Sequence, residues 1–131
     1  MKEKTGVLAE LTRPILGAAI EVHRALGPGL MESIYEECLC HELHLRKIAF
    51  QRQVSIPVIY KKINLDCNYR ADLIVGDVVI ELKTVESILA LHEAQLMTYM
   101  KLLKKPVGLV INFNVAILKD GIRRRVLQGS V

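Results

Sequence analysis

The chain has 131 residues, of which 51% are hydrophobic and 24% are charged, with a formal net charge of +4. This size predicts one domain that spans residues 1–131, and the balance is typical of a soluble globular protein. No apolar stretch reaches the length of a membrane span and no apolar signal-peptide core follows the start, so we expect a cytoplasmic location without a membrane partner.

The cysteines and the basic residues bound the chemistry further. Cys38, Cys40 and Cys67 are an odd number without the spacing of a disulfide framework, which is typical of a reducing compartment. The positive charge is concentrated at residues 61–62, 101–105 and 123–125. Such clusters can neutralise phosphates, although a charge run more often forms a solvated surface.

Two helices are predicted before residue 47. Apolar residues near a helical period indicate the first over residues 5–26, where Pro14 marks either a kink or a fresh start capped by Thr12. Gly27-Pro28-Gly29 breaks the chain, and a second helix is predicted over residues 30–46. The apolar stripe of this second helix is predicted to consist of Leu30, Ile34, Cys38, Leu39 and Leu43.

Short β-rich segments begin near residue 51. Residues 54–60 alternate like a strand, which Pro57 places at an edge or an irregular point, and residues 61–64 form a polar turn. The strands 69–75 and 78–83 flank the two-residue turn Gly76-Asp77. Counting outward from this turn pairs Leu73 with Ile80 and places Asp72 directly opposite Glu81.

A third helix and further strands complete the chain. The helix is predicted over residues 87–103, and residues 107–113 form an unbroken apolar run that is typical of a strand buried on both faces. A crossover helix implies that strands 78–83 and 107–113 are parallel neighbours. Residues 115–118, the Asp120-Gly121 turn and residues 122–127 predict a final hairpin. The element order therefore indicates an α/β fold with a mixed sheet.

The predicted hairpin carries the most informative group of residues. Because side chains alternate along a strand, Asp72, Glu81 and Lys83 project from one face, and Leu73, Ile80 and Leu82 project from the other. Two like charges directly opposed across a hairpin cost stability, and a divalent cation would compensate for that cost. The alternative is that these charges form the solvated face of a half-exposed hairpin.

Both flanking helices carry polar stripes. His92, Gln95 and Tyr99 lie on one stripe of the third helix, where glutamine and tyrosine can hydrogen-bond a phosphate or a metal-bound water. Alternatively, Tyr99 belongs to the core and His92 is structural. On the second helix, Glu32 either complements the helix dipole or supplies a third carboxylate, and spacing does not decide whether it or Glu36 faces the site.

A site with softer metal ligands is a further alternative. Cys40 and His44 are spaced i, i+4, and Cys38 and His41 lie close by. Zinc sites usually require a second, well-spaced ligand pair, which the sequence lacks. The sequence also lacks a phosphate-binding glycine loop and a nucleophile-elbow pattern.

Several segments resemble motifs of the GxxExxY protein family. The naming motif is Gly29-Leu30-Met31-Glu32-Ser33-Ile34-Tyr35, and further similar segments are residues 17–23, 69–72, 80–83, 92–96 and 111–114. That family is grouped with the PD-(D/E)XK nuclease superfamily. The resemblance implies a restriction-endonuclease-like αβββαβ core, with a mixed β-sheet flanked by helices, an extra N-terminal helix and a C-terminal β-hairpin.

The resemblance also implies a metal site. In the superfamily pattern, Asp72 and Glu81 match the metal-binding acids, and the backbone carbonyl of Leu82 completes a set of hard oxygen ligands for Mg²⁺ or Mn²⁺. Glu32 resembles the acidic residue of the preceding helix, as a further metal ligand. One departure is Ala71, which stands where the superfamily name has proline.

The resemblance assigns three more residues to catalysis. Lys83 matches the catalytic lysine, and Gln95 and Tyr99 resemble the QxxxY motif of the recombination-nuclease branch. The implied activity is metal-dependent hydrolysis of phosphodiester bonds in nucleic acid, with DNA favoured over RNA. One alternative is a non-catalytic nuclease-fold protein that binds nucleic acid or serves in assembly, as a homodimer or with a protein partner. Another is a phosphoesterase that acts on nucleotides.

Overall fold

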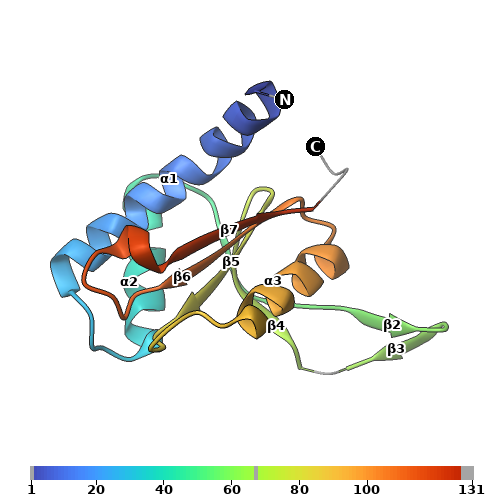
Figure 1. Cartoon of the computed structure of the whole chain (residues 1–131). Coiled ribbons are helices and arrows are strands. Elements are labelled where there is room, and N and C mark those ends of the chain that lie inside the picture. The colour runs from blue at the N-terminus through green and yellow to red at the C-terminus, as the bar shows by residue number, and fades with distance from the viewer. Residues whose placement is uncertain (1, 67, 128–131) are drawn as a thin grey trace.

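A five-stranded mixed sheet with helices on both faces forms the body of the molecule (Figure 1). The computed structural model describes residues 2–66 and 68–127, with side chains from Ala9 onward. The strand order is β1-β4-β5-β6-β7, and β2 and β3 form a separate ribbon. The helices are α1 (Lys2–Leu26), α2 (Glu32–Leu45), α3 (Ala90–Leu103) and the 3₁₀ helix η1 (Leu118–Gly121). The strands are β1 (Gln51–Ser55), β2 (Val58–Tyr60), β3 (Ile63–Leu65), β4 (Arg70–Val75), β5 (Val78–Lys83), β6 (Val107–Asn112) and β7 (Ile122–Val126). The predicted α/β fold, with a restriction-endonuclease-like mixed sheet, is confirmed.

The β4–β5 hairpin has the register that counting predicts. Gly76 adopts φ +56° in the turn, which a glycine accommodates without steric cost, and the ladder pairs Leu73 with Ile80. The ladder ends at that pair, so Asp72 and Glu81 are not joined by backbone hydrogen bonds. As predicted, β5 and β6 are parallel and α3 connects them.

Two apolar cores lie on opposite faces of the sheet. Helices α1 and α2 cover the face that carries Leu73, Ile80 and Leu82, and α3 covers the face that carries Ile74 and Val79. Burial of each of these large side chains contributes about 1.5–3 kcal/mol to folding. The predicted division of the hairpin side chains between two faces is confirmed for these residues.

Gly108 of β6 allows α3 to approach the sheet closely. A Cβ atom at this position would lie 2.5 Å from Met100 Sδ and 2.9 Å from Leu96 Cδ1. Because these distances are shorter than van der Waals contact, any larger residue would displace the helix or its side chains.

The two long helices differ from the prediction in detail. Helix α1 continues through Pro14, so the alternative of a fresh start near Thr12 is wrong. In α2, the residues that face the sheet are Tyr35, Leu39 and Leu43, whereas Ile34 is exposed. The sequence of α2 contains two overlapping apolar stripes, and only one of them can face the sheet at a time.

The strand predicted over residues 54–60 is divided at Pro57. This proline has no N–H group to continue a ladder, and the chain leaves the sheet there to form the β2–β3 ribbon. Part of the predicted turn at residues 61–64 belongs to β3, which begins at Ile63.

The predicted C-terminal hairpin between residues 115–118 and 122–127 is wrong. Residues 115–117 are not a strand, and Leu118–Gly121 is the 3₁₀ helix η1. Strand β7 pairs instead with the buried strand β6, whose backbone N–H and C=O groups on the side away from β5 need partners. Among the helices that the structure describes, none is both long enough and apolar enough to cross a bilayer.

Candidate active site

Two crossed hydrogen bonds, one between Asp72 and Glu81 and one between Leu82 and Asp72, hold the two acids where the β4–β5 ladder ends. The N–H of Asp72 donates to Glu81 Oε2 at 2.9 Å, and the N–H of Leu82 donates to Asp72 Oδ2 at 2.8 Å. Carboxylate oxygens thus take the place of backbone carbonyls at the point where the strands separate. The structure therefore brings together the two acids that the hairpin register places opposite each other.

The alternation of side chains fails beside Asp72. Ala71 packs with Ile74 and Val79 in the core under α3, although strict alternation would place it with Leu73 on the opposite face. In the neighbouring strand β1, Gln53 has a left-handed backbone with φ +52°. It lies opposite Asp72, but these two residues are not paired in the β1–β4 ladder. This local irregularity allows the Asp72 carboxylate to turn toward the Leu82 N–H.

Gln53 and Arg52 connect this pair to α2. Gln53 Nε2 donates to Glu36 Oε1 at 2.9 Å and lies 3.4 Å from Asp72 Oδ1. Arg52 Nε donates to Glu36 Oε2 at 2.6 Å, and the same guanidinium also contacts Glu37 at 2.8 Å. Glu36 is only 7% exposed, and the guanidinium of Arg52 on β1 neutralises its buried negative charge.

Two of the four acidic residues of α2, Glu32 and Glu36, approach the pair, but their environments differ. Glu32 is the first residue of α2 and is half-buried, and burial followed by the charge of Asp72 raises its pKa. Unlike that of Glu36, the side chain of Glu32 makes no hydrogen bond or ion pair with any residue in the described part of the chain. Glu32 is therefore the α2 carboxylate whose oxygens are free to bind a ligand.

Burial and mutual repulsion favour the protonated form of the central acids. Glu81 is 5% exposed, and burial together with the charge of Asp72 raises its pKa to about 8. Burial also raises the pKa of Asp72, and the charge of Glu36 adds to this effect. Lys83 acts in the opposite direction on both acids. Within the described residues its ammonium group forms no ion pair, so it lies near the acids without being held by one of them.

The α3 residues of the predicted site are divided. Tyr99 is buried in the same cluster as Ala71, the residue before Asp72, and burial followed by the charge of Glu81 raises the pKa of the tyrosine. Gln95 is exposed and makes no hydrogen bond to a described residue. His92 Nδ1 accepts a hydrogen bond from the N–H of Leu89 at 3.0 Å, which supports the structural interpretation of this histidine.

The donor set suits a hard divalent cation. Glu81 Oε1 accepts no hydrogen bond from a described residue, and Asp72 Oδ1 has only the long contact to Gln53. Among the described residues, no three His, Cys, Asp or Glu side chains converge as a closed metal cage. Mg²⁺ is commonly bound by one or two carboxylates while it keeps several waters, so a pair of acids with free oxygens fits such an ion.

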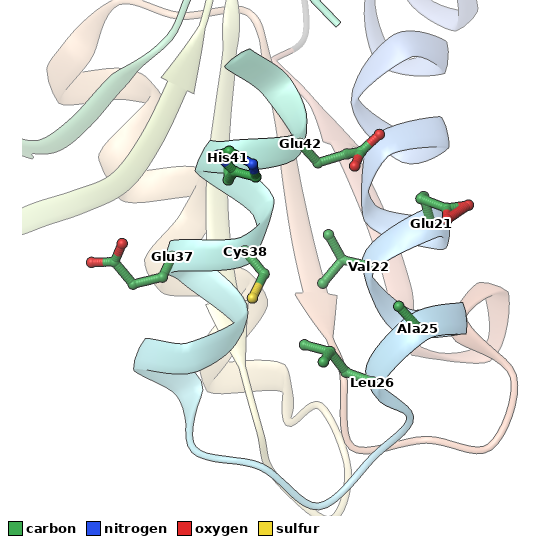
Figure 2. Close-up of a pocket in the computed structure, with 8 residues that line it drawn as sticks. All are labelled: Glu21, Val22, Ala25, Leu26, Glu37, Cys38, His41 and Glu42. Atoms are coloured by element: carbon green, nitrogen blue, oxygen red, sulfur yellow. The ribbon is translucent and has the colours of Figure 1, made fainter. Parts of the chain in front are cut away.

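The alternative zinc site at Cys38, Cys40, His41 and His44 receives no support. The described parts of these residues do not form a ligand cluster, and the described cysteines Cys38 and Cys40 are free thiols. Cys67 lies outside the described residues. Figure 2 shows the thiol of Cys38 pointing into a groove between α1 and α2, while Glu37 points to the opposite side of α2. None of the candidate site residues lines this groove.

Other motif residues serve the scaffold. Tyr35 Oη donates to the Gly27 carbonyl at 2.5 Å and accepts from the Leu30 N–H at 3.2 Å, and its ring stacks on Phe113 with centroids 4.5 Å apart. These bonds fix the loop that delivers Glu32 to the start of α2. The buried Asn112 similarly exchanges two hydrogen bonds with Val85, at 2.8 and 3.0 Å, and thereby holds the segment that follows Lys83.

Sequence reasoning missed Arg52, Gln53 and Tyr69. The register of β1 against β4 determines the positions of Arg52 and Gln53, and no short turn sets that register because the ribbon intervenes. Tyr69 lies with its ring centroid 6.2 Å from that of Tyr99. The sequence does offer one signal for Tyr69, which is its position directly before the Arg70–Val75 strand that carries Asp72.

Comparison with known proteins gives one match. The family model described as PD-(D/E)XK nuclease superfamily matches residues 9–125, a range that includes every candidate site residue. Neither the curated proteins nor the solved structures yield a match.

Proposed function

The chain belongs to the PD-(D/E)XK nuclease superfamily, and from this premise we propose that it is a metal-dependent nuclease that hydrolyses phosphodiester bonds in DNA. The observation that carries the proposal is the pair of crossed hydrogen bonds between Asp72, Glu81 and Leu82, with Lys83 two residues after Glu81. Within the superfamily, the Gly29 to Tyr35 motif supports assignment to the GxxExxY family.

Asp72 and Glu81 would hold Mg²⁺ or Mn²⁺, with the backbone carbonyl of Leu82 and the carboxylate of Glu32 as further ligands. The superfamily generally uses divalent metals, and the raised pKa values of Glu32, Asp72 and Glu81 fit carboxylates that face one another. When bound, the ion would supply positive charge that polarises the phosphate and lowers the pKa of a water molecule.

The remaining residues act on the substrate in this proposal. In hydrolysis, a water molecule gives up a proton to the solvent and its oxygen bonds to phosphorus, while the bond from phosphorus to the leaving oxygen breaks and that oxygen takes up a proton from the solvent. The Lys83 ammonium donates hydrogen bonds to the nonbridging oxygens, whose negative charge increases in the transition state. The Tyr99 hydroxyl donates to phosphate or water, and Gln95, exposed on the same helix stripe, contacts the bound strand.

A non-catalytic nucleic-acid-binding or assembly protein is the second candidate. The observation that favours it is that no three metal-binding side chains converge among the described residues. Such a protein would act as a homodimer or with a protein partner, and it would bind nucleic acid with the same affinity in a chelator.

The test is cleavage of single- and double-stranded DNA and RNA with Mg²⁺ or Mn²⁺. We expect cleavage of DNA by the wild-type chain, and a loss of at least about 100-fold in Asp72→Asn and Lys83→Ala. Asp77→Asn is the matched control because it makes the same chemical change at the exposed turn of the same hairpin. Full activity in Asp72→Asn would rule out this site. Tight binding of DNA in chelator, together with no cleavage when Mg²⁺ or Mn²⁺ is present, would favour the second candidate.

A further inference from the structure

The β2–β3 ribbon extends from the sheet with little support from the rest of the chain (Figure 1). All three residues of β3 are exposed, as are two of the three in β2. An isolated two-stranded ribbon is marginally stable in water, so a surface of this kind indicates a binding partner.

One face of the ribbon carries three aliphatic side chains and one tyrosine, and is apolar apart from the tyrosine hydroxyl. The register pairs Val58 with Leu65 and Tyr60 with Ile63, and paired residues at alternate positions project from the same face. Tyr60 and Ile63 are each 59% exposed. The opposite face carries Ile59 and Asn64.

Cations that form no ion pair with a described residue lie at the tip and at the base of the ribbon. Lys61 and Lys62 form the tip, both with left-handed backbones, and Arg70 stands at the base. Within the described residues none of the three forms an ion pair, and the Lys61 ammonium lies 5.3 Å from the Tyr60 ring centroid. The arginine cluster of β7 differs, because Arg125 there pairs with Glu93.

The base of the ribbon adjoins the candidate active site. The N–H of Ile56 donates to the Tyr69 carbonyl at 2.9 Å, which closes the ribbon where it meets the sheet. The Tyr69 ring, 49% exposed, lies beside the ring of Tyr99, and Asp72 follows three residues later. A polymer bound at the acids could therefore continue along Tyr69 to the ribbon.

We propose that the β2–β3 ribbon is an arm that binds duplex DNA beside the active site, an inference that rests on the proposed nuclease function. Lys61, Lys62 and Arg70 complement phosphates, and a two-stranded ribbon with apolar side chains fits a groove of B-form DNA. The major groove of A-form RNA is too deep and narrow for such contacts. A second copy of the ribbon would instead bring cations against cations, with Asp66 as the one acidic residue between β2 and β4 to offset them.

The test compares Lys61→Gln/Lys62→Gln with the control Lys101→Gln/Lys119→Gln, which removes the same charge from exposed positions on α3 and η1. Fluorescence anisotropy in chelator measures binding of labelled duplex DNA, single-stranded DNA and duplex RNA of one sequence. We expect the ribbon variant to bind duplex DNA about tenfold more weakly than the control, with a salt slope smaller by about two. A Tyr60→Ala/Ile63→Ser variant should weaken duplex binding without changing the slope.

The outcomes separate this inference from the proposed function. Unchanged duplex binding in both ribbon variants would overturn the arm while leaving the nuclease assignment intact. A ribbon variant that lowers the molecular mass in solution would reassign the surface to self-association and also overturn the arm. If the ribbon variant lost as much affinity for single-stranded DNA or for duplex RNA, the assignment of the arm to duplex DNA would be overturned. A wild-type chain that neither binds nor cleaves any of the probes would overturn the proposed function and the arm together.

Discussion

The Asp72 N–H donates to the Glu81 carboxylate across the last position of the β4–β5 hairpin, at 2.9 Å. Each acid is therefore positioned by the backbone of the strand opposite to it, since the Leu82 N–H binds Asp72. Because these donors belong to the sheet, the backbone itself holds the two carboxyl groups in place. The site is preorganised, and its main energetic cost is the burial of like charges.

Replacing Asp72 by asparagine should abolish stabilisation by metal. A ligand that binds only the folded chain at 100 times its Kd adds about 2.7 kcal/mol of stability, so Mn²⁺ should raise the Tm of the wild-type chain by several degrees. In Asp72→Asn, the side-chain amide oxygen can still accept from the Leu82 N–H, but it carries no charge to attract the ion. Differential scanning fluorimetry with Mn²⁺ and with chelator measures the shift. A full shift in Asp72→Asn, equal to that of Asp77→Asn, would contradict the assignment.

The Glu81→Gln variant should remove part of the pH dependence of stability. The folded pKa of Glu81 is raised from 4.5 to about 8, so between these values the unfolded chain ionises while the folded chain stays protonated. The stabilising contribution of the protonated group is therefore complete below pH 4.5 and is lost as pH rises toward 8. In chelator at pH 8, Glu81→Gln should be more stable than the wild type by about 1–3 kcal/mol.

The measurement is urea unfolding in chelator at pH 5 and pH 8. The difference between variant and wild type should be small at pH 5 and should grow at pH 8, whereas Asp77→Asn should follow the wild type at both values. A wild-type chain that gains stability relative to Glu81→Gln between these pH values would have the opposite sign and would refute the interpretation.

Removal of the Arg52 side chain should destabilise the fold. Glu36 is nearly buried, and Arg52→Ala leaves its charge without a cation, at a cost of about 1–3 kcal/mol. Arg46→Ala is the matched control, because it breaks the more exposed Arg46–Glu42 pair and should cost less than about 1 kcal/mol. Chemical denaturation measures both values. If Arg52→Ala cost no more than Arg46→Ala, Glu36 would not depend on the pairing.

Tyr35→Phe isolates the hydroxyl of the motif tyrosine. The ring retains its stacking on Phe113, but the hydrogen bonds to Gly27 and Leu30 are lost, so we expect a loss of about 1 kcal/mol. The loop before Glu32 should also loosen, which amide hydrogen exchange of residues 27–31 would detect. Tyr60→Phe, at an exposed position without a hydrogen bond to a described residue, should leave stability and exchange unchanged.

Much of the central sheet is predictable because local turns and connections define it. The two-residue Gly76-Asp77 turn determines the β4–β5 register, and the α3 crossover determines that β5 and β6 are parallel. From these relationships the proximity of Asp72 and Glu81 follows by counting. The functional roles of the other candidate residues stay predictions, because they depend on the reaction and not on the fold; these residues are Lys83, Tyr99, Gln95, Glu32 and Leu82.

The parts that sequence did not predict depend on contacts between distant segments. The position of Gln53 opposite Asp72 depends on pairing across the ribbon, and its left-handed backbone has no glycine to signal it. Similarly, β7 pairs with β6 rather than with residues 115–118 because a long buried strand offers more ladder partners than a short local hairpin. In α2, the stripe that contains Tyr35 is buried because Phe113 and the loop carbonyl of Gly27 receive its ring and hydroxyl.

Gly108 links a position on the buried strand β6 to the placement of the helix that carries Tyr99. Its missing methyl group determines how near Leu96 and Met100 come to the sheet, and these residues flank Tyr99 along the same helix. Because Tyr99 lies on this helix, Gly108 also influences how close the tyrosine comes to the sheet. A larger residue at position 108 would displace these side chains or the helix that carries them, so one missing methyl group on the strand beside β5 sets the distance between α3 and the sheet.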